Sequence, residues 1–193
     1  MSHTPEIALH IQPPLDGAQI IDLASERGCT PPDLDELAQA REMASRRMAH
    51  EVAPMETYLM VRELQPSAVL VFRELGVVTG VISSLFLRPQ ALPELVAARF
   101  NGVRPNPALL TREGERPGLV YSWGMAACSR AAAAAILGVG AEVTGRLFPR
   151  ITAFTRAVTD DGRRVAARNG YRPVTPDNQE WLVRTPASME LAA

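Results

Sequence analysis

A single arginine before an alanine-rich segment is the pattern in this sequence that most suggests chemistry. The apolar run Leu119–Ala127 is followed, three residues later, by Arg130 and then by five alanines, Ala131–Ala135. If these alanines begin a helix, its first backbone N–H groups have no partner inside the helix and form a site for an anion such as phosphate. The same residues also fit an ordinary helix start, since alanine is the best helix former.

Few side chains near this segment could transfer a proton. Tyr121 and Ser122 lie within the apolar run, and Glu74 ends the first strand of a predicted hairpin. These three side chains are the candidates for a general acid or base. Glu115, in the loop before the run, is a further carboxylate. Glu74 and Glu115 also fit solvated surface residues.

Histidine and cysteine spacing argues against a metal site and against disulfides. His3, His10 and His50 have no partner at the spacing of metal ligands, so no metal site is expected. Cys29 and Cys128 stand far apart and form no C-x-x-C motif. Reduced thiols, and with them a cytoplasmic location, are therefore expected.

Composition excludes several classes of protein. The 193 residues are 47% hydrophobic, which is enough for a packed core. A net charge of −1 gives no case for nucleic-acid or membrane-surface binding. The first residues lack a basic stretch and an apolar core, so no signal peptide is expected. No run approaches the ~18 apolar residues of a membrane span. All 20 basic residues are arginine, which excludes a Schiff-base lysine.

The pattern along the chain predicts a mixed sheet covered by helices. In order, it predicts a short strand at 6–11, helices at 17–28, 31–50 and 55–64, a hairpin at 67–87, a helix at 91–100, a loop at 103–118, a strand at 119–127, a helix at 129–147, a strand at 151–158, a helix at 160–170, and strands at 171–174 and 180–185. The predicted fold class is α/β (α+β), with a central sheet of six to seven strands flanked by helices. We expect one domain over 1–193, with a helical front half at 1–66, a sheet half at 67–184 and a loose tail at 185–193.

This order of elements resembles the GNAT superfamily of acyl-CoA-dependent N-acyltransferases, over about residues 67–184. In that family a central strand ends in free amides that pair with the pantetheine arm. The helix start that follows wraps the pyrophosphate, usually as Gln or Arg, two residues, Gly, one residue, then Gly or Ala. The resemblance implies that pantetheine pairs with Met125 and Ala127. It implies that the pyrophosphate is held by Arg130 and the amides of Ala131, Ala132, Ala133, Ala134 and Ala135.

A second segment, Thr159 to Tyr171, resembles the family's Asn, two residues, Ala, three residues, Tyr pattern, which ends in a Gly-aromatic pair. Gly170 and Tyr171 match that last pair. Thr159 replaces the Asn and Ala166 replaces the Tyr, which in the family often protonates the departing thiolate. Ala133 similarly replaces the first glycine of the pyrophosphate motif, where a methyl group can push the phosphate away.

Two functions are compatible with these residues. The resemblance implies a cytoplasmic acyltransferase that moves an acetyl or other short acyl group from coenzyme A to an amine on a small molecule or peptide. Acetyl-CoA or another acyl-CoA would be the cosubstrate, and a homodimer is compatible with the family. The alternative is a catalytically inactive GNAT-like binding or regulatory protein. Three departures favour it: Ala133 for Gly, Ala166 for Tyr, and the absence of a carboxylate from Leu119–Ala127.

Overall fold

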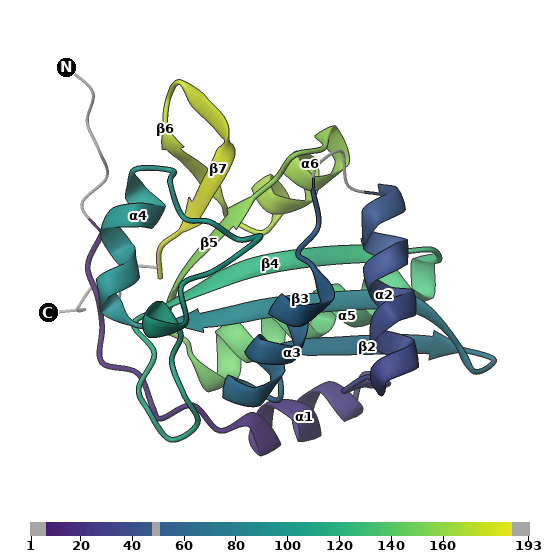
Figure 1. The fold of residues 1–193 in the computed structure, drawn as a ribbon. Coiled ribbons are helices and arrows are strands. Elements are labelled where there is room, and N and C mark those ends of the chain that lie inside the picture. The colour runs from purple at the N-terminus through teal and green to yellow at the C-terminus, as the bar shows by residue number, and fades with distance from the viewer. Residues whose placement is uncertain (1–6, 48–50, 187–193) are drawn as a thin grey trace, which may run out of the picture.

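A mixed seven-stranded sheet with helices on both faces organises the described part of the chain, residues 7–47 and 51–186 of this computed structural model (Figure 1). The strands are β1 (Cys29–Thr30), β2 (Val69–Glu74), β3 (Val77–Leu87), β4 (Leu119–Ala127), β5 (Thr152–Arg156), β6 (Arg172–Thr175) and β7 (Asn178–Arg184), in the spatial order β1-β2-β3-β4-β5-β7-β6. β4 and β5 pair in parallel, and the other neighbours are antiparallel. This confirms the predicted fold class.

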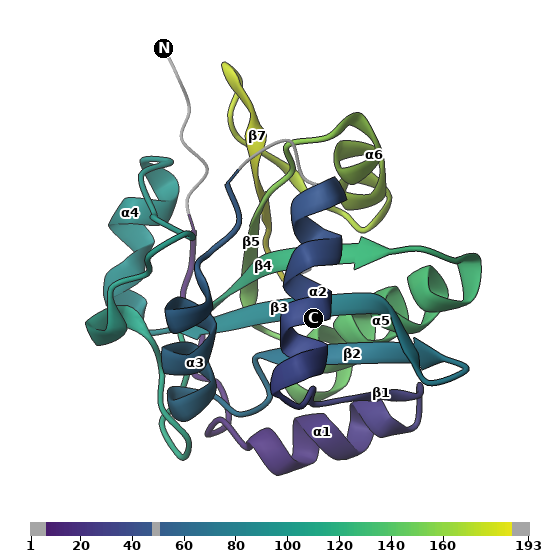
Figure 2. The same cartoon turned by 45° about the vertical axis from the view of Figure 1, so that its right-hand side comes forward.

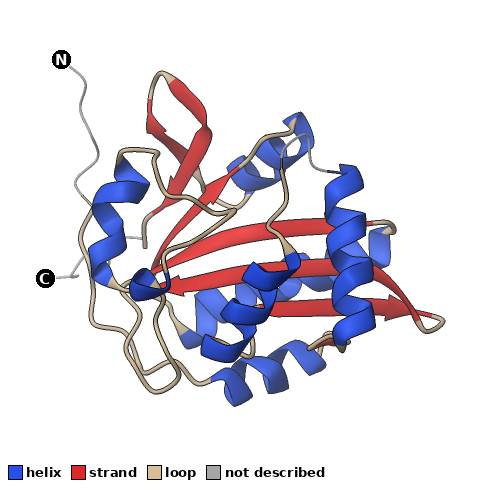
Figure 3. Ribbon diagram, viewed as in Figure 1, coloured by secondary structure: helices blue, strands red, loops and turns tan. Residues whose placement is uncertain are grey.

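Six α-helices surround the sheet in the described residues (Figure 3). They are α1 (Gly17–Ser25), α2 (Leu34–Arg47), α3 (Met55–Leu64), α4 (Leu92–Val96), α5 (Arg130–Glu142) and α6 (Asp160–Arg168). Figure 2 shows α2 and α3 in front of the sheet, with α5 behind it and α1 along the β1 edge. The short 3-10 helices Pro89–Ala91 and Pro107–Leu109 and the π-helical turn Val143–Leu147 complete the helical segments.

The two faces of the sheet have separate hydrophobic cores, because successive strand residues point to opposite faces. On β3, Val81 and Leu85 lie in the core beneath α2, α3 and α4. Ile82 and Phe86 lie in the core beneath α1 and α5. The ring of Tyr121, on β4, lies in the first of these cores, together with residues of α2 and α3. The helices α2 and α3 therefore pack directly over β4.

The prediction of a strand at 6–11 is wrong for residues 7–11, which the structure describes and which are not in a strand. The seventh strand is instead β1, in which Cys29 pairs with Phe72 and Thr30 with Val71. Two residues are too short a run to show an alternating pattern. The helix expected at 91–100 ends at Val96, and Ala98 has a φ of 55°, which is incompatible with a continuing helix. The predicted tail lies outside the described residues beyond position 186.

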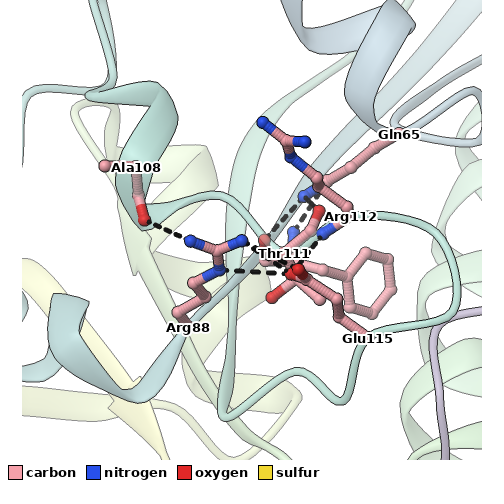
Figure 4. A network of polar contacts seen from close by, with 7 residues as sticks. Gln65, Arg88, Ala108, Thr111, Arg112 and Glu115 are labelled. Atoms are coloured by element: carbon pink, nitrogen blue, oxygen red, sulfur yellow. Dashed lines mark hydrogen bonds and ion pairs between the residues drawn. The ribbon is translucent and has the colours of Figure 1, made fainter.

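A buried glutamine fixes the segment that precedes β4. Gln65, at the end of α3, is fully buried, and its side-chain amide donates to the carbonyls of Phe86 at 2.6 Å and Thr111 at 2.8 Å. Its Oε1 accepts the Phe86 N–H at 3.0 Å. Figure 4 shows this network beside Glu115, which accepts from the Arg88 guanidinium at 2.9 Å and from the Arg112 N–H at 3.0 Å. These contacts hold the 103–118 loop against β3.

Candidate functional site

The parallel strands β4 and β5 separate halfway along β4. Their pairing runs from Leu119 opposite Thr152 to Ser122 opposite Thr155, and it stops there. Within the described chain, residues 123–127 of β4 therefore have no strand partner on the β5 side. Figures 1 and 2 show the two strands leaving the same end of the sheet and diverging toward α6 and α5. An interior strand with one free edge is a site where a ligand can complete the hydrogen bonding.

A β-bulge lies where the two strands part. Ser83 pairs with Gly124 and Ser84 pairs with Ser122, so Trp123 is the extra residue on β4. A bulge bends its strand and changes the direction of the next side chains. Here it coincides with the end of the β4–β5 pairing, and the indole of Trp123 is anchored by a 2.5 Å hydrogen bond from Nε1 to the Gly102 carbonyl.

Backbone groups of Met125 and Ala127 point into the opening. The Cys128 N–H donates to the Thr79 carbonyl at 2.7 Å, so these two residues form a hydrogen-bonded pair. In an antiparallel ladder such pairs alternate with pairs whose N–H and C=O groups point outward. The register then directs Ala126 toward β3, and Met125 and Ala127 toward the β5 side. The structure thus places the predicted pantetheine-binding amides on the free edge.

The start of α5 lies two residues beyond this edge. Ser129 is the N-cap, and its hydroxyl accepts the Ala132 N–H at 3.0 Å, while its carbonyl accepts the Ala133 N–H at 3.0 Å. Ala132 and Ala135 are buried against the sheet, and Ala132 would be 3.0 Å from a Cβ at Gly80. Ser129 therefore already uses two of the amides predicted to hold a pyrophosphate, and those of Ala134 and Ala135 lie inside the helix, where they donate to carbonyls four residues earlier.

The remaining predicted phosphate ligands lie on the outer side of the same helix turn. Arg130, Ala131 and Ala134 are exposed and Ala133 is half-buried. The Arg130 side chain has no ion-pair partner among the residues that the structure describes. An anion at this end of the helix would meet the Arg130 guanidinium and the N–H groups of Arg130 and Ala131 without displacing a protein ion pair.

A cavity opens on the opposite face of the sheet, above the β4 bulge. Its volume is about 110 Å³, and its walls come from α2, α3, the 100–103 segment, β3, β4 and the end of β5. Residues that line it include Arg41, Glu51, Tyr58, Tyr121, Trp123 and Arg156. Gly124, next to the bulge, also lines it, so the cavity reaches the point where β4 becomes free.

Aromatic rings form much of the cavity wall. Tyr58 and Trp123 lie with ring centroids 4.5 Å apart, and Tyr121 lies 5.1 Å from Phe100 and 5.9 Å from Trp181. Burial raises the pKa of Tyr58 and of Tyr121 to about 12 in each case, so both phenols are neutral at physiological pH. Sequence reasoning named Tyr121 but missed Tyr58, because nothing in the spacing of α3 shows that it lies over β4.

A pair of hydroxyl groups lies on the α5 and α6 side of the opening. The Tyr171 hydroxyl is 3.4 Å from the Ser122 hydroxyl. The sequence predicts Ser122 as an acid–base candidate, whereas Tyr171 matches only the Gly-aromatic pair of the family resemblance. Ala166, at the position of the missing family tyrosine, is buried against Ala157 and Leu182. The structure therefore brings a different tyrosine to the last residue of the β4–β5 pairing.

Two carboxylates that the sequence offers, Glu74 and Glu115, lie away from this opening. Glu74 ends β2 at the hairpin, where it pairs with Val77, and it does not line the cavity. Glu115 is held by Arg88 and by the Arg112 N–H, and these hydrogen bonds lower the pKa of its carboxyl group. It serves as a structural anchor of the loop.

Other classes of site find no support in residues 7–47 and 51–186. No group of three or more His, Cys, Asp or Glu side chains there could hold a metal ion. His3 and His50 lie outside the described residues. Cys29 is buried and Cys128 is exposed, and both are free thiols. Among the helices of this part of the chain, none has the length and apolar character needed to cross a membrane.

Comparisons with known proteins find likeness to solved structures. No protein-family profile matches the chain, and no curated protein matches it. A crystal structure titled as histone acetyltransferase HPA2 and related acetyltransferase, from Corynebacterium glutamicum ATCC 13032, is 18% identical and aligns over 94% of this chain and 98% of that chain, with a TM-score of 0.44.

Proposed function

We propose that this chain is a GNAT-type N-acyltransferase, which moves an acetyl or other short acyl group from coenzyme A to an amine. The free β4 edge carries the proposal. Met125 and Ala127 direct N–H and C=O groups toward the side on which β5 has separated. An extended amide-containing arm such as pantetheine would complete that edge as an added strand does. The acyl-CoA would supply the thioester. The chain would bind and orient the two reactants and would accept and donate protons.

The two reactants approach the opening from opposite faces of the sheet. The exposed start of α5, with Arg130, receives the anionic part of the coenzyme, and the arm runs back along residues 127–123 toward the bulge. The amine enters from the aromatic cavity on the other face, beside Gly124. Both reactants then meet where the sheet is open, and this positioning supplies much of the acceleration.

Besides positioning, the reaction needs one proton to be taken from the amine nitrogen and one to be given to the departing sulfur. The amine nitrogen bonds to the thioester carbonyl carbon, the carbon–sulfur bond breaks, and one proton passes from nitrogen to sulfur in net terms. Tyr171, paired with Ser122 at the end of the β4–β5 ladder, is the group we assign to donate a proton to the sulfur. On the cavity side Glu51 is the one carboxylate among the described lining residues, and it is exposed at the rim.

A second candidate function is a catalytically inactive binding or regulatory protein of this fold, which has no need of a tight coenzyme site. The capped start of α5 favours it, since Ser129 already occupies the N–H groups of Ala132 and Ala133. Ala133→Gly separates the two functions. It removes the methyl group and should strengthen coenzyme binding if the start of α5 closes on a pyrophosphate. The substitution should also destabilise the helix by about 1 kcal/mol.

Calorimetric titration of the purified protein with acetyl-CoA and with free coenzyme A tests the proposal. We expect micromolar binding, about −8 kcal/mol, and about tenfold weaker binding in Arg130→Ala. The matched control is Arg146→Ala, because Arg146 lies at the far end of the same helical segment and pairs with Glu142. No binding at millimolar coenzyme, or equal binding in Arg130→Ala and Arg146→Ala, would overturn the coenzyme site.

A further inference from the structure

The cavity above the β4 bulge contains a positive charge that no acid of the described chain balances. Arg41 of α2 lines the cavity, and its Nε donates to the Ala53 carbonyl at 2.8 Å. No Asp or Glu forms an ion pair with it among the described residues, although Glu51 also lines the cavity. The other lining arginine, Arg156, is paired with Glu180 at 2.9 Å. A guanidinium with free donors is a ready partner for a carboxylate.

Two buried phenol groups in the same cavity also lack partners. Tyr58 is 8% exposed and Tyr121 is 5% exposed, and both line the cavity. Neither hydroxyl has a hydrogen-bond partner within residues 7–47 and 51–186, yet neither is sealed from solvent. The charge of Arg41 acts on the Tyr58 hydroxyl and that of Arg156 on the Tyr121 hydroxyl. Both hydroxyls can therefore hydrogen-bond to polar atoms of a ligand that enters the cavity.

The size and walls of the cavity limit the rest of the ligand. A volume of about 110 Å³ is in the range of cavities that hold a single small ring. The tilted ring pairs Tyr58–Trp123 and Tyr121–Trp181 offer flat apolar surfaces to such a ring. The ligand therefore has a planar or compact apolar body and an anionic group.

We propose that this cavity binds a small amine that carries an aromatic or compact apolar side chain and a carboxylate, with the carboxylate on Arg41 and the Tyr58 hydroxyl. Its role as the acyl acceptor rests on the proposed function, whereas its binding does not require coenzyme A. The same charge distribution disfavours a polyamine, since Arg41, which no acid of the described chain pairs, repels a chain of ammonium groups. Glu51 at the rim is the one described lining residue that attracts the amine.

Tryptophan fluorescence of the full chain measures this binding without coenzyme. Both tryptophans of the sequence, Trp123 and Trp181, line the cavity, so the signal reports on its contents. The probes are L-phenylalanine, L-tryptophan analogues without indole emission and 4-aminobenzoate, compared with phenethylamine, L-alanine and spermidine. We expect L-phenylalanine to bind at least about tenfold more tightly than phenethylamine, which lacks the carboxylate, and than L-alanine, which lacks the ring.

Variants on α2 and α3 assign the carboxylate site. Arg41→Gln should remove the preference for L-phenylalanine over phenethylamine, and Arg46→Gln should keep it. Arg46 lies on the same helix and pairs with Glu42 at the surface, outside the cavity. Because Arg41 also holds the Ala53 carbonyl, Tyr58→Phe provides a second variant that keeps the ring and removes only the hydroxyl. It should weaken L-phenylalanine several-fold and leave phenethylamine unchanged.

Each outcome decides between the two proposals. Binding of L-phenylalanine without binding of acetyl-CoA supports the ligand class and rejects the acyltransferase. Binding of acetyl-CoA with no ring-bearing carboxylate bound at 10 mM, about the weakest useful affinity, rejects the ligand class alone. Equal affinity for phenethylamine or spermidine, or an unchanged preference in both Arg41→Gln and Tyr58→Phe, also overturns it.

Discussion

The hydroxyl groups of Ser122 and Tyr171 lie 3.4 Å apart, although 49 residues separate them in the sequence. Gly170, with a φ of 80°, turns the chain from α6 toward β6, and the Tyr171 N–H donates to the Ala166 carbonyl at 3.0 Å. The Arg184 guanidinium lies over the Tyr171 ring, 5.5 Å from its centroid. The phenol is thereby fixed at the last pair of the β4–β5 ladder, beside the proposed reaction site.

Tyr171→Phe tests whether this phenol donates a proton. If the chain transfers acyl groups, the variant should lose about 100-fold in kcat, the lower end of what a positioned acid contributes. Its coenzyme affinity should remain, because the ring and its contact with Arg184 are kept. Steady-state kinetics and calorimetry on the same preparation separate these quantities. Turnover equal to that of the unmodified chain would remove Tyr171 from the mechanism.

Hydrogen exchange of the β4 amides tests the free edge directly. In the ligand-free protein the Ala126 N–H, directed toward β3, should exchange slowly, and the N–H groups of Met125 and Ala127 should exchange fast. Saturating acetyl-CoA should slow Met125 and Ala127 selectively, with Ala126 as the internal control. The measurement is residue-resolved NMR exchange. Slowing of all three amides alike would indicate a general tightening of the sheet and no pairing with the coenzyme arm.

Much of the fold follows from local signals that the sequence states clearly. The strand Leu119–Ala127 and the helix Met55–Leu64 have the predicted limits, because Gly118 and Pro54 stand at their starts. Leu75 and Gly76, with φ values of 52° and 79°, form the tight hairpin turn that was predicted. Local turn and cap chemistry therefore determined the order of elements from the hairpin onward.

The site itself depends on contacts that no local signal contains. The early end of the β4–β5 pairing is a relation between strands that α5 separates in the sequence, and the bulge at Trp123 leaves no mark in the strand's composition. Arg41 and Tyr58 reach the cavity from the helical front half, whose pattern predicts helices but no orientation over β4. The predicted edge residues Met125 and Ala127 could be named only because the family resemblance supplied them.

Gln65→Leu tests the clamp that holds the loop before β4. Leucine has a similar volume but leaves the Phe86 N–H and the Thr111 carbonyl without their buried partner, whereas the Phe86 carbonyl keeps the Thr111 N–H. We expect a loss of about 2–3 kcal/mol in the free energy of unfolding. Urea denaturation measures it, with Gln19→Leu on the exposed side of α1 as the control. A loss below about 0.5 kcal/mol would mean that water replaces the amide at no cost.

Acid denaturation tests the ion pair that joins α2 to β2. The Arg73 guanidinium hydrogen-bonds Glu36 at 2.5 Å, and the Asp33 N–H donates to the same carboxylate at 2.9 Å. These bonds, led by that of Arg73, lower the pKa of Glu36 from 4.5 to about 2. Because the folded-state pKa is the lower one, the stabilisation is complete above pH 4.5 and is lost as the pH falls toward about 2.

Glu36→Gln should therefore lower the free energy of unfolding by about 1 kcal/mol at pH 7, a value near the upper end for partly exposed pairs. The difference from the unmodified chain should shrink between pH 4.5 and about 2, the interval that the two pKa values define. Glu42→Gln, which breaks the exposed pair with Arg46 on the same helix, should change stability little at any pH. Thermal unfolding followed by circular dichroism across this pH range measures all three proteins. A constant difference between Glu36→Gln and the unmodified chain would show that the carboxylate does not titrate with the shift assigned to it.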